Sequence, residues 1–166
     1  SRSEVRKKIL NQNGINCEVI PADIDENQVK ESLFEEKATP EIISKNLAEL
    51  KANKISQKKN GELELGADSI IDLNGKIISK PSNRNEALII LKKLNGKKHY
   101  LISSVCISKN GSMIWNYTDK AELTMKSFLE QDLKIYLSKI SDEALYAYNV
   151  YQIEGEGRNL FLNIEG

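Results

Sequence analysis

The sequence predicts an α/β fold in which helices flank a mixed sheet that contains hairpins. Several stretches carry apolar residues at helical spacing, and they alternate with short apolar runs typical of buried strands. Two Asn-Gly pairs, Asn74-Gly75 and Asn110-Gly111, each separate two such runs, which is a strong signal for a two-residue hairpin turn. Because 40% of the 166 residues are hydrophobic, one compact domain is expected.

Local signals place the individual helices and strands. Ser3 can cap a first helix that Gly14 ends, and Thr39-Pro40 supplies the cap and first-turn proline of another. In chain order, the expected elements are a helix over 4–13, a strand over 17–20, an acidic loop over 23–26, a helix over 40–57, strands over 65–73 and 76–79, a helix opened by Ser82 to about 94, strands over 100–108 and 113–125, a helix opened by Ser127 to about 137, and a mixed apolar segment over 150–164.

Composition excludes several classes of protein. The 24 basic and 24 acidic residues balance, so we expect no binding to duplex nucleic acid. No apolar run approaches the roughly 18 residues of a membrane span, and no signal peptide is visible, so no membrane association is expected. Cys17 and Cys106 leave a single disulfide open, but a reduced cytoplasmic chain is the better-supported interpretation. The chain begins at Ser1 without a methionine, which suggests a fragment or a processed form.

One acidic residue lies within an apolar strand-like run. Asp68 lies in the motif Gly-Ala-Asp-Ser, where a carboxylate costs several kcal/mol unless it is paired or takes part in chemistry. Lys80, followed by Pro81, comes after the turn at Asn74-Gly75, so the returning chain can bring a cation towards this acid. An acid with well-placed cations is what hydrolysis of a phosphate anhydride requires.

Other charged residues fall near the ends of predicted elements. Three cations and three acids could meet in one cleft, where the cations would hold a triphosphate and the acids would hold a divalent metal and orient water. They are Arg6, Lys51, Lys80, Glu26, Asp68 and Glu154. Taken singly, each lysine or arginine is more often a solvated residue, and Lys80 could be a turn residue. The only histidine, His99, is interpreted as a structural hydrogen-bonding group rather than a catalyst.

Six short blocks occur in a fixed order across nearly the whole chain. They are SRSEVRKKIL at 1–10, DE at 25–26, LAELKA at 47–52, GADS at 66–69, KP at 80–81 and LNGKKH at 94–99. Together they resemble the Maf family, also called septum-formation-inhibitor-like proteins, which are nucleoside triphosphate pyrophosphatases. One block alone is weak, whereas the ordered set is specific.

Some residues depart from the commoner members of that family. Glu154 stands where they carry glutamine, and Ser103-Ser104 replaces Thr-Gly. These differences resemble a branch with a Tyr-Gln-Leu-Glu-Gly motif. In the commoner members, the positions of Val5, Ser69 and Glu154 help to select the base. The family also continues beyond both ends of this sequence, so we expect a single Maf-like domain over 1–166 that is truncated at both ends.

The resemblance implies a fold, a reaction and a set of site residues. The fold would be an elongated, twisted Maf/ITPase-like sheet with two lobes around a central cleft. The reaction would convert a nucleoside triphosphate and water to a monophosphate and pyrophosphate, clearing modified or excess nucleotides. Asp68 would be the catalytic base and, with Glu26, a ligand of Mg²⁺ or Mn²⁺. The substrate would be bound by Ser3, Arg6, Lys51, Ser69, Lys80 and Glu154.

The partners and the competing function also follow from the resemblance. The expected partner is a small nucleotide in the cytoplasm, without duplex nucleic acid or membrane, and a homodimer is left open. The alternative is a non-catalytic nucleotide-binding or septation-linked interaction protein.

Overall fold

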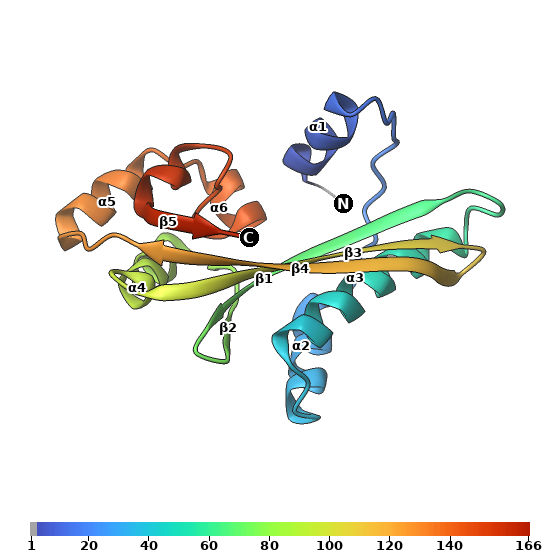
Figure 1. The fold of residues 1–166 in the computed structure, drawn as a ribbon, viewed down its shortest axis with the longest axis horizontal. Coiled ribbons are helices and arrows are strands. Elements are labelled where there is room, and N and C mark those ends of the chain that lie inside the picture. The colour runs from blue at the N-terminus through green and yellow to red at the C-terminus, as the bar shows by residue number, and fades with distance from the viewer. Residues whose placement is uncertain (1–2) are drawn as a thin grey trace. The chain divides into compact units, whose positions relative to one another are not determined.

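The computed structural model describes residues 3–166 of the chain, and these residues divide into two compact units. The first comprises residues 3–69 with Ile102–Asp119, and the second comprises Ile70–Leu101 with Lys120–Gly166. The predicted α/β class is confirmed, and two units agree with the two expected lobes. The elements are α1 (Glu4–Gln12), α2 (Glu26–Glu35), α3 (Pro40–Ser56), β1 (Glu64–Leu73), β2 (Lys76–Ile78), α4 (Arg84–Leu94), β3 (Lys98–Lys109), β4 (Ser112–Met125), α5 (Glu130–Ser138), α6 (Asp142–Tyr148), the 3-10 helix η1 (Glu156–Leu160) and β5 (Phe161–Glu165) (Figure 1).

The five strands form a sheet in the order β2-β1-β3-β4-β5. The sequence predicted a mixed sheet, but the sheet is antiparallel. Its register aligns Leu73 with Lys76 across β1 and β2, and Glu122 with Glu165 across β4 and β5. The predicted alternation of helix and strand does not produce a parallel pair here. The reason is that α4 leads from β2 to β3, and β3 pairs with β1 rather than with β2.

Both predicted hairpin turns are present. Asn74 and Gly75 have φ values of 54° and 79°, and Asn110 and Gly111 have values of 51° and 85°. Positive φ at both central residues is the pattern of the tight turn whose twist matches that of paired strands, and asparagine and glycine adopt it at low cost. The two Asn-Gly pairs therefore fix where β1 turns into β2 and where β3 turns into β4.

Side-chain caps begin the three helices of the first unit. The Ser3 oxygen accepts a hydrogen bond from the Arg6 backbone N–H, and Asp25 and Thr39 cap α2 and α3 in the same way. The sequence predicts an acidic loop over 23–26 and no helix directly after it, but Asp25 caps α2. The predicted strand over 17–20 is wrong, since these residues lie outside any strand. A strand needs a hydrogen-bonding neighbour, which an apolar run alone cannot reveal.

Helix α3 packs very closely against β1 (Figure 1). A Cβ atom at Gly66 would lie 2.1 Å from the carbonyl oxygen of Ala48 and 2.7 Å from the backbone nitrogen of Ala52. Ala48 and Ala52 are themselves buried. Only glycine in the strand and small residues in the helix permit this approach, and the approach sets the distance between side chains of α3 and those of β1.

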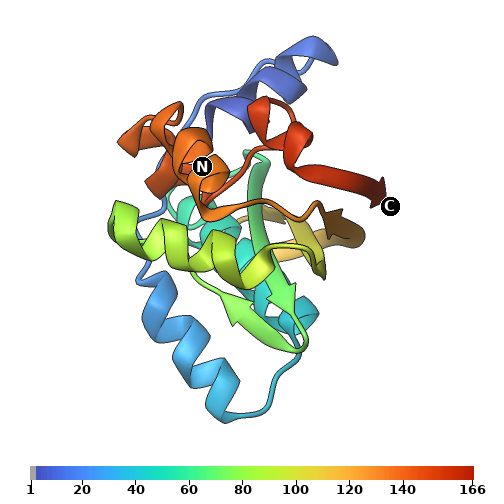
Figure 2. The same ribbon diagram turned by 90° about the vertical axis from the view of Figure 1, so that its left-hand side faces the viewer.

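In the second unit, α4 and α5 pack together over the core, and the β1–β2 hairpin lies near α4 (Figures 1 and 2). Two predicted caps are displaced. Asn83 rather than Ser82 caps α4, and α5 begins at Glu130, after Leu129, without a side-chain cap. Serine is only one of several residues that can cap a helix, so its position alone misplaces a boundary by a few residues.

His99 lies in the core of the second unit and is 1% exposed. Its Nε2 lies 3.0 Å from the Tyr151 hydroxyl, and the Tyr151 ring meets Phe161 edge-on. The predicted hydrogen bonding of His99 is confirmed. Burial lowers the pKa of His99 to about 4, because the charged imidazolium loses its hydration there.

Two further sequence expectations concern the cysteines and membrane helices. Cys17 and Cys106 are both free thiols, as expected for a reduced chain. Within residues 3–166, none of the helices combines the length and the apolar character that crossing a membrane demands.

Substitution of Gly66 by alanine should destabilise the protein. The new methyl group meets backbone atoms of α3 rather than a flexible side chain, so β1 or α3 has to shift. Such overpacking costs roughly 1–3 kcal/mol, measured as the free energy of unfolding in urea. Gly155→Ala is the matched control, because its Cβ would have no neighbour closer than 3.9 Å and the backbone φ is −129°. Equal stability of the two variants would contradict the close approach.

The stability of the protein should fall as the pH falls from about 6.5 to 4. In this window the unfolded chain binds a proton at His99 that the folded core excludes, so unfolding is favoured. The contribution is on the order of 3 kcal/mol. Urea unfolding at pH 7 and pH 4.5 measures it, and His99→Gln should flatten this part of the profile. An identical slope in the variant would show that other groups cause the loss.

Candidate active site

The first unit brings three of the predicted charged residues into one cluster. The ammonium nitrogen of Lys51 lies 2.7 Å from Asp68 Oδ1 and 2.7 Å from Glu26 Oε1. Lys30 adds a second cation, 3.9 Å from Glu26 Oε2. Lys51 therefore pairs with both carboxylates, and its contact with Asp68 is a charge-assisted hydrogen bond. Glu26, Lys51 and Asp68 are called the acid–lysine cluster below.

Each member of the acid–lysine cluster comes from a different element. Asp68 is in the middle of β1, two residues after Gly66, so both lie on the strand face that α3 covers. Lys51 projects from α3, and Ser44 on the same helix donates a hydrogen bond to the Asp68 carbonyl at 3.4 Å. Glu26 begins α2, which packs on α3. The close contact at Gly66 therefore brings the lysine within reach of the buried acid.

Asp68 is the least accessible of the three residues. Its side chain is 7% exposed, compared with 15% for Lys51 and 30% for Glu26. Its second carboxylate oxygen, Oδ2, is buried and has no hydrogen-bond partner. A buried oxygen without a partner costs free energy, and such a group in a native fold calls for an explanation such as catalysis or an ion. The Asp68 carboxylate is therefore the strongest single candidate for chemistry in the first unit.

Arg6 and Ser69 form a second group on the first unit. Arg6 donates from Nη1 to the Ala67 carbonyl at 3.0 Å and from Nη2 to Ser69 Oγ at 3.1 Å. Ser69 Oγ in turn lies 2.9 Å from Ser103 Oγ. Because successive side chains of a strand point to opposite faces, Ser69 and Asp68 lie on opposite faces of β1. Ser3 belongs here through its cap on the Arg6 backbone N–H.

The remaining two predicted residues belong to the second unit. Lys80 follows β2 and is exposed, and the next residue, Pro81, is buried. Glu154 is exposed in the turn that precedes η1. Convergence of all six predicted charged residues on one cleft stays a prediction. The first two residues of the 1–10 block lie outside the described part of the chain.

The carboxylates of the acid–lysine cluster fit a divalent cation that needs few ligands from the protein. Across residues 3–166, no group of three or more histidine, cysteine, aspartate or glutamate side chains is arranged to hold a metal. Mg²⁺ commonly uses only one or two protein carboxylates and takes its other ligands from water and substrate phosphates. Glu26 and Asp68 meet that requirement, since both already direct an oxygen at one cation and Asp68 Oδ2 has no partner.

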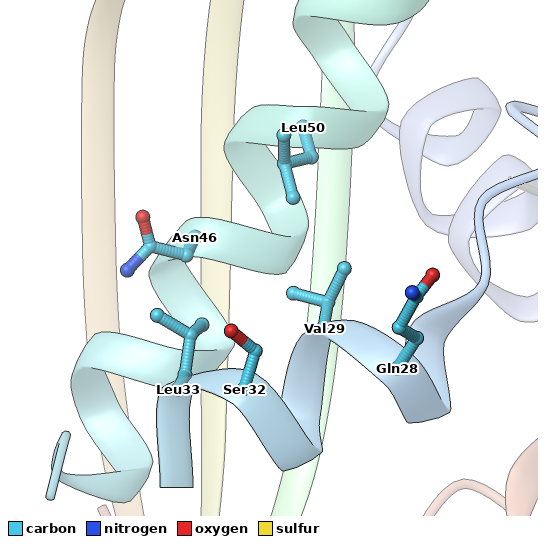
Figure 3. Close-up of a pocket in the computed structure, with 6 residues that line it drawn as sticks. All are labelled: Gln28, Val29, Ser32, Leu33, Asn46 and Leu50. Carbon is cyan, nitrogen blue, oxygen red and sulfur yellow. The ribbon is translucent and has the colours of Figure 1, made fainter. Parts of the chain in front are cut away.

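A separate groove of about 350 Å³ lies between α2 and α3 (Figure 3). Figure 3 shows its side chains on the facing sides of the two helices. They are Gln28, Val29, Ser32, Leu33, Asn46 and Leu50. The lining contains no charged side chain, so the groove lacks the groups that would hold a triphosphate.

Sequence reasoning missed three residues that contact the predicted ones. Ser103 and Ser44 are bonded to Ser69 and to the Asp68 carbonyl, and Lys30 pairs with Glu26. The helical spacing of Glu26 and Lys30 would have revealed the last pair had α2 been recognised. The serines carry no such local signal, because their partners are 34 and 24 residues away in the chain.

Comparison with known proteins identifies relatives along the full length of the chain. A model of the family described as Maf-like protein matches residues 1–166. A nucleoside triphosphate pyrophosphatase of Pelagibacter ubique (strain HTCC1062) is 70% identical over 166 residues, which is 100% of this chain and 85% of the relative.

More distant relatives carry the same or a narrower name. A nucleoside triphosphate pyrophosphatase of Ruegeria sp. (strain TM1040) is 36% identical over 166 residues, covering 100% of this chain and 83% of the relative. A 7-methyl-GTP pyrophosphatase of Brucella abortus biovar 1 (strain 9-941) is also 36% identical, with the same coverage of 100% and 83%.

Proposed function

The chain belongs to the Maf family, and from this membership and the acid–lysine cluster we propose that it hydrolyses a nucleoside triphosphate to a monophosphate and pyrophosphate. The observation that carries the proposal is the buried carboxylate of Asp68, bonded to Lys51 at 2.7 Å, with one oxygen lacking a partner. The names of relatives at 70% and 36% identity support the reaction class.

The chemistry requires a proton acceptor and a sink for negative charge. A water oxygen attacks the α-phosphorus, the bond from that phosphorus to the α–β bridging oxygen breaks, and pyrophosphate leaves with the bonding electrons. Asp68 accepts the proton that the water loses. Arg6, Lys51 and Lys80 neutralise the charge that moves onto the leaving pyrophosphate.

A divalent cation, Mg²⁺ or Mn²⁺, would be held by Glu26 and Asp68. When bound, it would supply charge stabilisation to the phosphate oxygens. Ser3 sets the start of α1 and so the backbone at Arg6, while Ser69 accepts a hydrogen bond from the Arg6 guanidinium. These two serines position the arginine rather than react themselves.

The substrate within the class depends on base recognition. We place Glu154 and Ser69 at the base, since glutamate only accepts hydrogen bonds whereas the glutamine of the commoner members both donates and accepts. Modified or excess nucleotides in the cytoplasm are the proposed substrates, and two free thiols suit a reducing compartment. Pyrophosphate release against a panel of ordinary and modified triphosphates, including 7-methyl-GTP, tests the proposal. Absence of release from every member would overturn it.

Replacement of Asp68 by asparagine should abolish turnover and leave the fold intact. The change is nearly isosteric but removes the proton acceptor, so kcat should fall about 10²–10⁴-fold. Pyrophosphate release and a thermal melt measure the two effects. Asp72→Asn is the control, because Asp72 is also a buried acid of β1 and bonds the Gly75 backbone N–H. Wild-type turnover in Asp68→Asn would contradict its role as the base.

Lys80→Ala and Glu154→Gln should have opposite signatures across the substrate panel. Phosphates carry no base identity, so Lys80→Ala should lower kcat/KM for every triphosphate by a similar factor, about 10²-fold. Glu154→Gln should instead change the ratio of rates between purine and pyrimidine substrates. A changed ratio in the lysine variant, or an unchanged ratio in the glutamine variant, would remove that residue from its proposed role.

A further inference from the structure

The position of Lys51 suggests more than contact with phosphate. Its ammonium lies 2.7 Å from a carboxylate oxygen on each side, where a cation bridging Glu26 and Asp68 would lie. We propose that Lys51 is an exchangeable counter-ion. Without nucleotide, the Lys51 ammonium pairs with both carboxylates and blocks a metal from binding them. When a triphosphate binds, Lys51 moves onto the phosphates and frees both carboxylates for a divalent metal. This inference rests on the proposed function.

The first argument is that Asp68 cannot react while Lys51 is in place. Asp68 Oδ1 accepts a hydrogen bond from the ammonium, and Oδ2 is buried without a partner. While Lys51 stays there, its ammonium occupies Oδ1, and Oδ2 is closed to solvent. The Asp68 side chain is 7% exposed, compared with 15% for Lys51 and 30% for Glu26, so the acid is the most buried member of the cluster. Movement of Lys51 opens Asp68.

The second argument concerns local charge. Two carboxylates and one ammonium leave a net charge of about −1, which Lys30 at 3.9 Å from Glu26 partly offsets. If Lys51 moved away and nothing replaced it, Asp68 and Glu26 would lose the charge of its ammonium beside a buried strand, at high cost. A divalent cation replaces the lost charge, while the triphosphate attracts the displaced ammonium. Each ligand thus lowers the cost of the movement that the other requires.

Metal and nucleotide should therefore bind cooperatively. Both ligands need Lys51 away from the carboxylates, so the first to bind bears the cost of displacement and the second does not. Such coupling is reciprocal and typically amounts to about 5–150-fold in affinity. Without the Lys51 ammonium, the carboxylates are already open, so the metal should bind more tightly on its own and the coupling should disappear.

Binding of Mn²⁺, followed by the electron paramagnetic resonance signal of free Mn²⁺, tests this inference. It is measured with and without an α,β-methylene triphosphate, which the enzyme cannot cleave, and corrected for Mn²⁺ bound to the nucleotide alone. In the wild type, the analogue should tighten Mn²⁺ binding at least about fivefold. In Lys51→Met, nucleotide-free binding should be at least about fivefold tighter than in the wild type, and the analogue should add little.

Lys54→Met is the matched control, since Lys54 is on the same helix and its ammonium donates to the Asp23 carbonyl rather than to a carboxylate. Its Mn²⁺ affinity and coupling should equal those of the wild type. Nucleotide-free binding by Lys51→Met no tighter than by the wild type would overturn the inference. Lys51→Gln is a second variant in case Lys51→Met does not fold. If neither variant folds, the wild-type titration alone tests the inference, and equal Mn²⁺ affinity with and without the analogue would overturn the inference.

Pyrophosphate release by the wild type separates this inference from the proposed function. Release without metal–nucleotide coupling would remove the counter-ion exchange and leave the pyrophosphatase proposal standing. No release from any triphosphate on the panel would remove the proposed function and, with it, the inference.

Discussion

The first unit depends on the neutralisation of a carboxylate inside a β-strand. Asp68 lies in an otherwise apolar part of β1, and its charge is tolerated because Lys51 donates to it at 2.7 Å. That contact requires α3 to lie almost on the strand backbone, which the absence of a side chain at Gly66 permits. The motif Gly-Ala-Asp-Ser thus combines a packing residue with a buried charged one, two positions apart on the same face.

Much of the fold could be predicted from local signals. Both Asn-Gly turns, the Ser3 cap and the Thr39-Pro40 helix start are physical constraints contained within a few residues, and all four are present. Asp68 of β1 was also recognisable as a candidate site residue, because an ionised group in a buried apolar run is costly unless it is paired or takes part in chemistry. Its pairing with Lys51 had a weaker basis, since the two are 17 residues apart and their contact depends on helix packing.

The features that could not be predicted depend on contacts between distant parts of the chain. Helix α2 is polar and has no buried residue, so its apolar pattern was too weak to show a helix. The segment 17–20 has the composition of a strand but lies outside any strand. Ser103 reaches Ser69 only because β3 lies next to β1. For the segment 17–20 and for Ser103, the deciding information is a neighbour in space, which a single sequence does not contain.

Arg6 and Lys51 differ in kind, and the difference matches their surroundings. Arg6 directs a planar, rigid pair of donors at a carbonyl and a hydroxyl, which fixes α1 against β1. Lys51 carries a compact charge on a flexible stem and meets two single carboxylate oxygens. A guanidinium at position 51 would grip a carboxylate through two parallel bonds, whereas an ammonium can leave without breaking a bidentate geometry. The residue that must be held in place is therefore arginine, and the residue that can exchange partners is lysine.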